Sequence, residues 1–151
     1  LVIHRQPETS MPKSLILTHE QVPDKEAPGI AGRQPQQYRY LANDTLCYHG
    51  VLVPGLMPAA INGLVEYEHL LGRQQAAKLE STPVELRTPC FLSRYIYAPA
   101  RYLEQGLPIQ VWDDSGFRRA LVDFSENAKV SSHLFEVPSE YQEMTIGAPA
   151  E

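Results

Sequence analysis

The chain has 151 residues, 43% hydrophobic and 21% charged, a composition typical of one globular domain rather than of a disordered or fibrous protein. The formal net charge is −5, and basic residues do not cluster anywhere in the sequence. The chain therefore lacks the basic patch expected of a nucleic-acid-binding protein. The longest apolar stretch, residues 51–65, is interrupted by prolines and glycines and is shorter than the roughly 20 residues that cross a bilayer, so we expect no membrane span.

Prolines and polar residues are frequent in residues 1–36, which predicts an irregular N-terminal arm. Within this arm, Ser14–His19 has the β-compatible residues of a possible edge strand. Residues 1–10 lack the basic start, apolar run and cleavage site of a secretory signal, and the sequence leaves open whether they are native.

The next predicted element is a half-buried strand at Gln37–Leu41, where Tyr38 and Tyr40 alternate with a polar residue. It ends in a turn-like stretch, residues 42–45. The two cysteines, Cys47 and Cys90, each lie in an apolar run and are expected to be buried free thiols. That expectation favours a reducing, cytoplasmic setting.

A long helix is predicted to begin at Pro54 or Gly55, because an earlier start would place Pro54 inside the helix and remove a backbone hydrogen bond. Apolar residues then recur at helical spacing as far as Leu71, so we expect a mostly buried helix. Gly72 is a candidate C-terminal cap.

After the helix the periodicity becomes strand-like, at Leu79–Arg87 and again in the aromatic stretch Phe91–Tyr97. The clearest pattern is a hairpin, in which Ile109–Trp112 and Phe117–Phe124 flank the turn Asp113–Gly116. The remaining C-terminal residues, 136–151, are expected to form a weakly ordered tail.

This order of elements, an early strand, a long helix after a Pro-Gly turn and then antiparallel strands, resembles the hot-dog fold. Residues 51–56 look like the turn that opens the central helix of β-hydroxyacyl-ACP dehydratases and polyketide-synthase dehydratase domains. Residues 43–49 are similar to the stretch before that turn, and residues 82–89 to the strand after the helix. The resemblance implies an α+β domain over residues 37–135 in which a curved antiparallel sheet wraps a long central helix.

The departures from these families leave alternatives open. His49 lies closer to Gly55 than the histidine of the stand-alone dehydratases does, and Ala60 stands where their helix carboxylate would fall. In the polyketide-synthase register, Thr45 takes the place of the catalytic histidine. A second register, similar to the His-Gly turn of MaoC-like hydratases, conflicts with the position of Pro54.

The function implied by the resemblance is hydration or dehydration of β-hydroxyacyl or enoyl thioesters carried by CoA or an acyl carrier protein. His49 is then either the general base, since the ordinary pKa of histidine suits proton transfer near neutrality, or a structural residue. The amide of Gly55 is the candidate donor to the oxyanion, unless Gly55 only forms the turn. Asp44 either orients His49, acts as acid/base itself or only forms an Asx turn, and Tyr48 and Asn43 are candidate substrate-binding residues.

Two other functions compete with this one. A hot-dog thioesterase would hydrolyse the acyl thioester, with which the missing helix acid is compatible. A non-catalytic or cyclase-like biosynthetic relative would be expected to have a degenerate site. We expect no metal, because the histidines and cysteines lack metal-ligand spacing, and no cofactor, because no phosphate-cradling glycine loop is present. A homodimer is implied by the resemblance.

Overall fold

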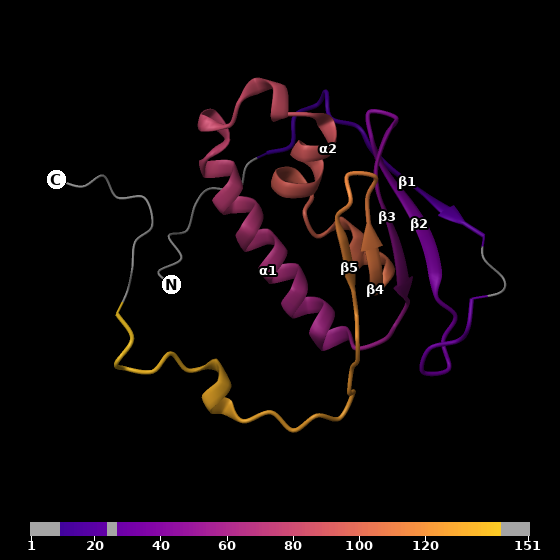
Figure 1. The fold of residues 1–151 in the computed structure, drawn as a ribbon, viewed down its shortest axis with the longest axis vertical. Helices are drawn as coiled ribbons and strands as arrows, with labels where there is room; N and C mark the ends of the chain where they lie inside the picture. Colours follow the sequence, from indigo (N-terminus) through magenta and orange to yellow (C-terminus); the bar gives the residue numbers. More distant parts are fainter. Residues whose placement is uncertain (1–9, 24–26, 143–151) are drawn as a thin grey trace. The chain divides into compact units, whose positions relative to one another are not determined.

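The computed structural model describes residues 10–23 and 27–142. The described residues divide into two units, a larger one that ends at residue 124 and a smaller one of residues 125–142. The larger unit contains a five-stranded antiparallel sheet whose strands are ordered β1-β2-β3-β4-β5 (Figure 1). These strands are β1 (Leu17–Val22), β2 (Gln36–Ala42), β3 (Thr45–Val53), β4 (Leu107–Trp112) and β5 (Arg118–Ala120).

The helical segments of the larger unit lie between β3 and β4 in the sequence. One long helix is followed by a series of short ones, and the 3₁₀-helix at Ser132–Phe135 belongs to the smaller unit. The segments before β4 are α1 (Pro58–Ala77), 3₁₀-helices at Leu79–Ser81 and Val84–Leu86, α2 (Pro89–Leu92), a π-helix (Ser93–Tyr97) and a 3₁₀-helix (Arg101–Gln105).

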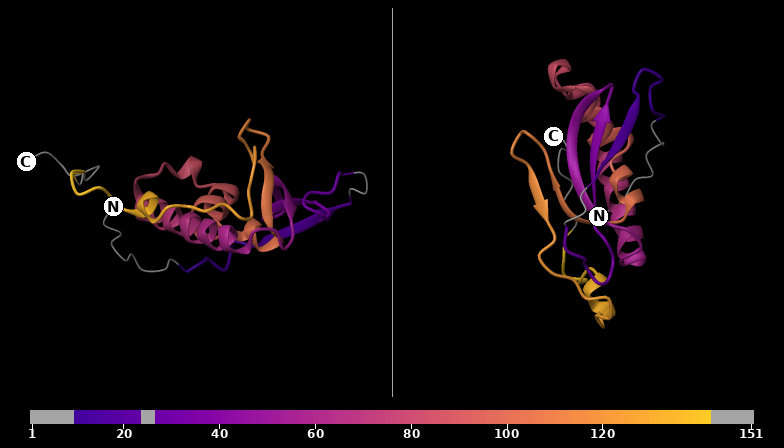
Figure 2. Two further views of the ribbon diagram at one scale, coloured as in Figure 1. Left: turned by 90° about the horizontal axis from the view of Figure 1, so that it is seen from below. Right: turned by 90° about the vertical axis from the view of Figure 1, so that its right-hand side faces the viewer.

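One face of the sheet carries the core, because alternate residues of a strand point to the same side. Tyr40 pairs with Tyr48 across β2 and β3, and their rings stack with centroids 4.7 Å apart. Ile61, Leu64 and Val65 of α1 pack against this cluster, so α1 lies on that face of the sheet (Figures 1 and 2). The buried residues of the cluster are Tyr38, Tyr40, Tyr48, Leu52, Ala100, Tyr102, Leu103 and Val111.

The hot-dog prediction is wrong. The sheet is not curled around a central helix, and α1 is a 20-residue helix of which Gly72 is the one buried residue. The α+β class is right, but the helix is half-exposed on one face of the sheet. The two strands expected at Leu79–Arg87 and Phe91–Tyr97, which would have extended the sheet around the helix, are absent from the described fold.

Two Thr-Pro pairs explain why those segments are helical. Pro89 stands at the first turn of α2, where its missing N–H costs no hydrogen bond, and the Thr88 hydroxyl accepts a hydrogen bond of 3.2 Å from the Phe91 amide. Pro83 likewise precedes the 3₁₀-helix Val84–Leu86. The aromatic residues of the second segment therefore lie on helical turns and not on a strand.

Other boundaries also differ from the prediction. α1 begins at Pro58 rather than at Pro54 or Gly55, with Met57 in a left-handed conformation before it. It continues past Gly72 to Ala77 because the residues that follow the glycine, Arg-Gln-Gln-Ala-Ala, all favour helix. The predicted hairpin is confirmed as β4 and β5, but β5 ends at Ala120 and not at Phe124. The strand predicted at Gln37–Leu41 is confirmed as β2, and β1 begins within the predicted edge strand Ser14–His19 and extends beyond it.

β3 is the central strand, although the sequence predicted no strand at residues 46–53. It follows β2 through a two-residue turn, in which Asn43 and Asp44 have φ values of 47° and 61°. Positive φ at both positions is what a type I′ hairpin turn requires, and Asn and Asp tolerate it better than most residues.

Cys47 and Cys90 form a disulfide, so the prediction of free thiols is wrong. The expectation of a reducing compartment was based on those free thiols and therefore has no support. The disulfide joins β3 to α2 across 43 positions of the sequence. The two apolar runs that suggested separate buried thiols instead meet at the edge of the core.

None of the helices that the structure describes has both the length and the apolar character that a membrane crossing requires. In the smaller unit, the described residues 125–142 expose large apolar side chains, Leu134 and Phe135 among them. Of the predicted tail 136–151, the last nine residues lie outside the described part of the chain, as do residues 1–9 of the predicted arm.

Candidate functional site

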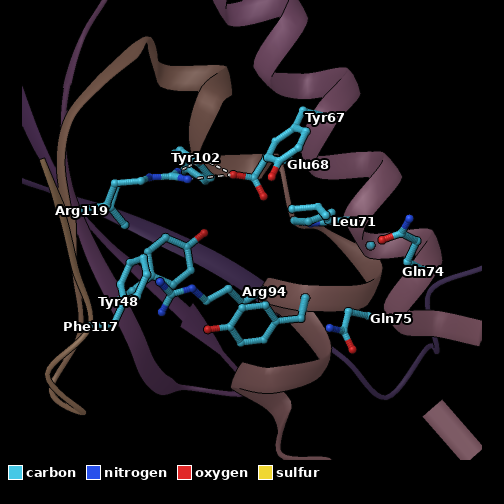
Figure 3. A pocket seen from close by; sticks show the side chains of 14 residues that line it. Tyr48, Tyr67, Glu68, Leu71, Gln74, Gln75, Arg94, Tyr102, Phe117 and Arg119 are labelled. Carbon is cyan, nitrogen blue, oxygen red and sulfur yellow. Dashed lines mark hydrogen bonds and ion pairs between the residues drawn. The ribbon is translucent and has the colours of Figure 1, made fainter. Parts of the chain in front are cut away.

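A cavity of about 350 Å³ lies between α1, the π-helix and the sheet (Figure 3). Its volume is at the lower end of the roughly 300–1,000 Å³ that small-molecule sites occupy. Aromatic rings form much of its wall, and two arginines and one glutamate supply its charges. The lining residues are Tyr48, Tyr67, Glu68, Leu71, Gly72, Gln74, Gln75, Arg94, Tyr95, Pro99, Tyr102, Val111, Phe117 and Arg119.

Four large side chains of this wall remain partly exposed to solvent. Their exposed fractions are 54% for Tyr67, 36% for Leu71, 42% for Tyr95 and 39% for Phe117. They come from α1, the π-helix and the turn before β5, yet they converge on one cavity. Exposed apolar groups that gather in one place, rather than being scattered singly, are typical of a binding site.

Arg94 is held among aromatic rings. Its guanidinium carbon lies 4.2 Å from the ring centroid of Phe117, 5.1 Å from that of Tyr48 and 5.4 Å from that of Tyr95, so the charge is stabilised by cation–π contacts. Its Nη1 donates to Asp113 Oδ2 at 2.6 Å. This side chain is therefore fixed in place before any ligand arrives.

Asp113 also holds the turn between β4 and β5. Its Oδ1 accepts hydrogen bonds from the Ser115 amide at 2.9 Å, the Ser115 hydroxyl at 2.6 Å and the Phe117 amide at 3.1 Å. Burial alone would raise the pKa of Asp113, but these hydrogen bonds and the one from Arg94 outweigh it and hold the pKa below its ordinary value. The carboxylate stays charged and positions both Arg94 and Phe117.

A second polar cluster forms the opposite wall. Glu68 Oε1 accepts from the Tyr102 hydroxyl at 2.7 Å and pairs with Arg119 Nη1 at 3.2 Å, while Arg119 Nη2 donates to the Tyr102 hydroxyl. Burial, and then the hydrogen bond to Glu68, raises the pKa of Tyr102. Tyr102 is therefore a neutral hydrogen-bond donor at physiological pH.

A third arginine lies behind the cavity. Arg101 donates from Nε to the Tyr48 hydroxyl at 3.2 Å and from Nη1 to the Leu41 carbonyl at 3.0 Å, and its buried Nη2 has no partner among the described residues. Burial raises the pKa of Tyr48 despite this arginine. Among the residues that line the cavity, two guanidinium groups, of Arg94 and Arg119, stand against the one carboxylate of Glu68, so the wall carries a positive excess in an acidic protein.

The π-helix is positioned by two contacts on either side of Arg94. The disulfide from Cys47 holds α2, which leads directly into the π-helix. On the other side, α1 comes so close at Gly72 that an added Cβ would lie 2.9 Å from Pro99 Cγ and 3.2 Å from the Ile96 carbonyl oxygen. Turns of π-helix within helices are frequent at functional sites, because they displace side chains from the regular helical pattern.

The structure brings one of the residues predicted from the sequence, Tyr48, into this cavity. His49 follows Tyr48 on β3 and lies on the opposite face of the sheet, where its ring stacks on Trp112 at 5.0 Å. Its role as a base stays a prediction, as does its pairing with the oxyanion donor.

The other predicted residues lie in turns. Asn43 and Asp44 form the exposed turn between β2 and β3, where the Asn43 side chain accepts a hydrogen bond of 2.8 Å from the Ile16 amide. Gly55 is exposed and lies three positions before Pro58, where α1 begins. Its amide is therefore not one of the free amides in the first turn of the helix, on which the predicted oxyanion site depended.

Sequence reasoning missed the charged residues of the cavity, Glu68, Arg94 and Arg119. Glu68 was not singled out as a site residue, and Arg94 lies in the segment that was predicted to be a strand. The Thr88-Pro89 capping pattern was the available signal for a helix there. In the part of the chain that the structure describes, no group of three His, Cys, Asp or Glu side chains is placed to hold a metal ion.

Comparisons with protein-family models, with curated proteins and with solved structures found no match for this chain. The function is therefore inferred from the cavity itself.

Proposed function

We propose that this protein binds a small organic ligand with a planar apolar part and an anionic group in the cavity between α1, the π-helix and the sheet. The observation that carries the proposal is the convergence of Tyr67, Leu71, Tyr95 and Phe117, all partly exposed, around the fixed guanidinium of Arg94. A planar group entering the cavity covers these side chains and removes their apolar surface from water.

The charge balance supports an anion. Arg94 already has Asp113 as a partner, and Arg119 has Glu68, but no carboxylate pairs with Arg101 among the described residues. An anion next to Arg94 therefore meets a local positive excess, and the rings around the cavity lower the effective dielectric constant and strengthen that attraction.

The test uses 8-anilino-1-naphthalenesulfonate, a planar fluorescent anion, titrated into the protein at neutral pH. We expect saturable binding that Tyr67→Ala weakens about tenfold, since a half-exposed aromatic wall is lost without a hole in the core. Leu86→Ala removes an equally exposed apolar side chain outside the cavity and should leave binding unchanged.

A second pair of variants tests the anion. Arg94→Gln should weaken binding of the sulfonate, whereas Arg39→Gln should not, because Arg39 pairs with Glu20 outside the cavity. Circular dichroism melting of each variant shows whether it is folded. Equal binding by wild type, Tyr67→Ala and Arg94→Gln would contradict the proposal.

As a second function we propose hydration or dehydration of an acyl thioester, with His49 as the base. His49 Nδ1 is buried and has no hydrogen-bond partner among the described residues, and an unpaired buried group of this kind is found at catalytic positions. A ligand reaches this atom only after the groups that cover it move. Loss of enoyl absorbance from crotonyl-CoA tests hydration, and release of free thiol from a saturated acyl-CoA tests the thioesterase alternative. Turnover that His49→Ala leaves unchanged would remove His49 from either reaction.

A further inference from the structure

The cavity has two polar ends of opposite hydrogen-bonding character. At one end stands Arg94, a side chain that can only donate. At the other stands Glu68, whose charged carboxylate only accepts. Figure 3 shows Glu68 reaching into the cavity from α1 and Arg94 entering from the π-helix, with Tyr48 on the wall of the cavity.

At the Glu68 end one oxygen is still free to accept. Both the hydrogen bond from Tyr102 and the contact with Arg119 use Oε1, and Oε2 has no hydrogen-bond partner in residues 10–23 and 27–142. The Glu68 side chain is only 14% exposed. Oε2 itself is not fully buried, so it faces the open cavity, and a ligand that donates a hydrogen bond would replace solvent at this oxygen.

At the Arg94 end, donors are still free. Nη1 is used by Asp113, and Nε and Nη2 have no acceptor within the described part of the chain. This side chain, too, is only 14% exposed. A guanidinium offers donors in a planar fork that matches a carboxylate, so an anionic group of the ligand fits this end.

Resting on the proposed function, we infer that the ligand is a small aromatic acid with a hydrogen-bond donor, a hydroxyl or an amino group, on the far side of its ring. The acidic group binds Arg94, the ring packs against Tyr67, Leu71 and Phe117, and the donor binds Oε2 of Glu68. Each polar end then disfavours a ligand that lacks its partner, because such a ligand would remove the charged group from solvent without giving it a hydrogen bond.

The test is calorimetric titration with three matched probes: 4-hydroxyphenylacetate, phenylacetate, which lacks the donor, and 4-hydroxyphenylacetamide, which lacks the charge. Wild type should bind the first roughly ten- to a hundredfold tighter than either of the others, the effect of one hydrogen bond to a charged group. Glu68→Gln should abolish the preference over phenylacetate and keep the preference over the amide.

Glu66→Gln is the matched control, since Glu66 is an exposed acid on the same helix that does not line the cavity, and it should behave as wild type. If phenylacetate binds wild type as tightly as 4-hydroxyphenylacetate, or if Glu68→Gln keeps the full preference, the inferred ligand class is wrong while the cavity remains a binding site. If none of the three probes and no naphthalenesulfonate binds wild type, the proposed function itself fails, and this inference fails with it.

Discussion

Arg94 and Asp113 form an ion pair of 2.6 Å that joins the π-helix to the turn between β4 and β5. Both side chains are mostly buried, with exposed fractions of 14% and 12%. Because the same carboxylate also binds the amides of Ser115 and Phe117, one residue positions a charge and an aromatic ring of the candidate site. The cavity therefore depends on contacts between segments that are remote in the sequence.

The first prediction concerns pH. The folded-state pKa of Asp113 is lower than its unfolded-state value, so its contribution to stability is present above the unfolded pKa of about 3.9 and is lost as the pH falls through the folded pKa. Asp113→Asn should lower the free energy of unfolding by roughly 1.5–3 kcal/mol at pH 7. The difference from wild type should shrink below about pH 4.

Thermal melting of both proteins from pH 7 to pH 2.5 measures this effect. Asp114→Asn, a change at the exposed neighbouring residue, is the control and should follow wild type. A constant difference between Asp113→Asn and wild type at all pH values would show that the charge of Asp113 has no part in it.

The second prediction concerns the disulfide. Removing it with Cys47→Ala/Cys90→Ala should lower the free energy of unfolding by roughly 3–4 kcal/mol, because the unfolded chain is no longer closed across 43 positions. Urea denaturation with and without dithiothreitol measures the difference, and the double variant should not respond to the reductant. Two thiols that react in unfolded, unreduced protein would mean that the disulfide does not form.

The third prediction concerns the approach of α1 to the π-helix at Gly72. Alanine there gains helix propensity, but its Cβ meets Pro99 Cγ and the Ile96 carbonyl oxygen, which belong to a ring and to backbone. Overpacking should therefore dominate, with a net loss of about 1–3 kcal/mol and weaker ligand binding.

Gly63→Ala is the matched control for Gly72→Ala. Gly63 is in the same helix and an added Cβ would meet nothing within 4 Å, so this change should stabilise the protein by about 0.5–1 kcal/mol. Chemical denaturation of both variants compares them directly. The proposed close contact would be refuted by equal stabilisation at the two positions.

The fourth prediction concerns the core face of the sheet. Leu52 on β3 is fully buried, so Leu52→Ala should lower the free energy of unfolding by about 2–5 kcal/mol. Val84→Ala changes an exposed apolar residue and should alter stability by no more than about 0.5 kcal/mol. Similar losses in the two variants would contradict the assigned core.

Local sequence signals predicted the elements that depend on neighbouring residues. The hairpin predicted at the turn Asp113–Gly116 is present in the structure. The Asp113 side chain accepts a hydrogen bond from the turn backbone and the glycine tolerates its conformation, whatever packs against the turn. The strand containing Tyr38 and Tyr40 was recognisable because burial on one side imposes alternation. The Pro-Gly turn, by contrast, was assigned to the helix start, and the helix begins three positions later.

The sequence by itself determined the α+β class, the β4–β5 hairpin and the approximate extent of the long helix, because turn chemistry, alternation and helical spacing act over a few residues. Only the tertiary structure decided that α1 lies on one face of an uncurled sheet and that Cys47 pairs with Cys90. It alone also brought Glu68, Arg94 and Arg119 around one cavity. Those relationships arise from the packing of segments that are far apart in the chain, and periodicity within each segment carries no information about which other segment it will meet.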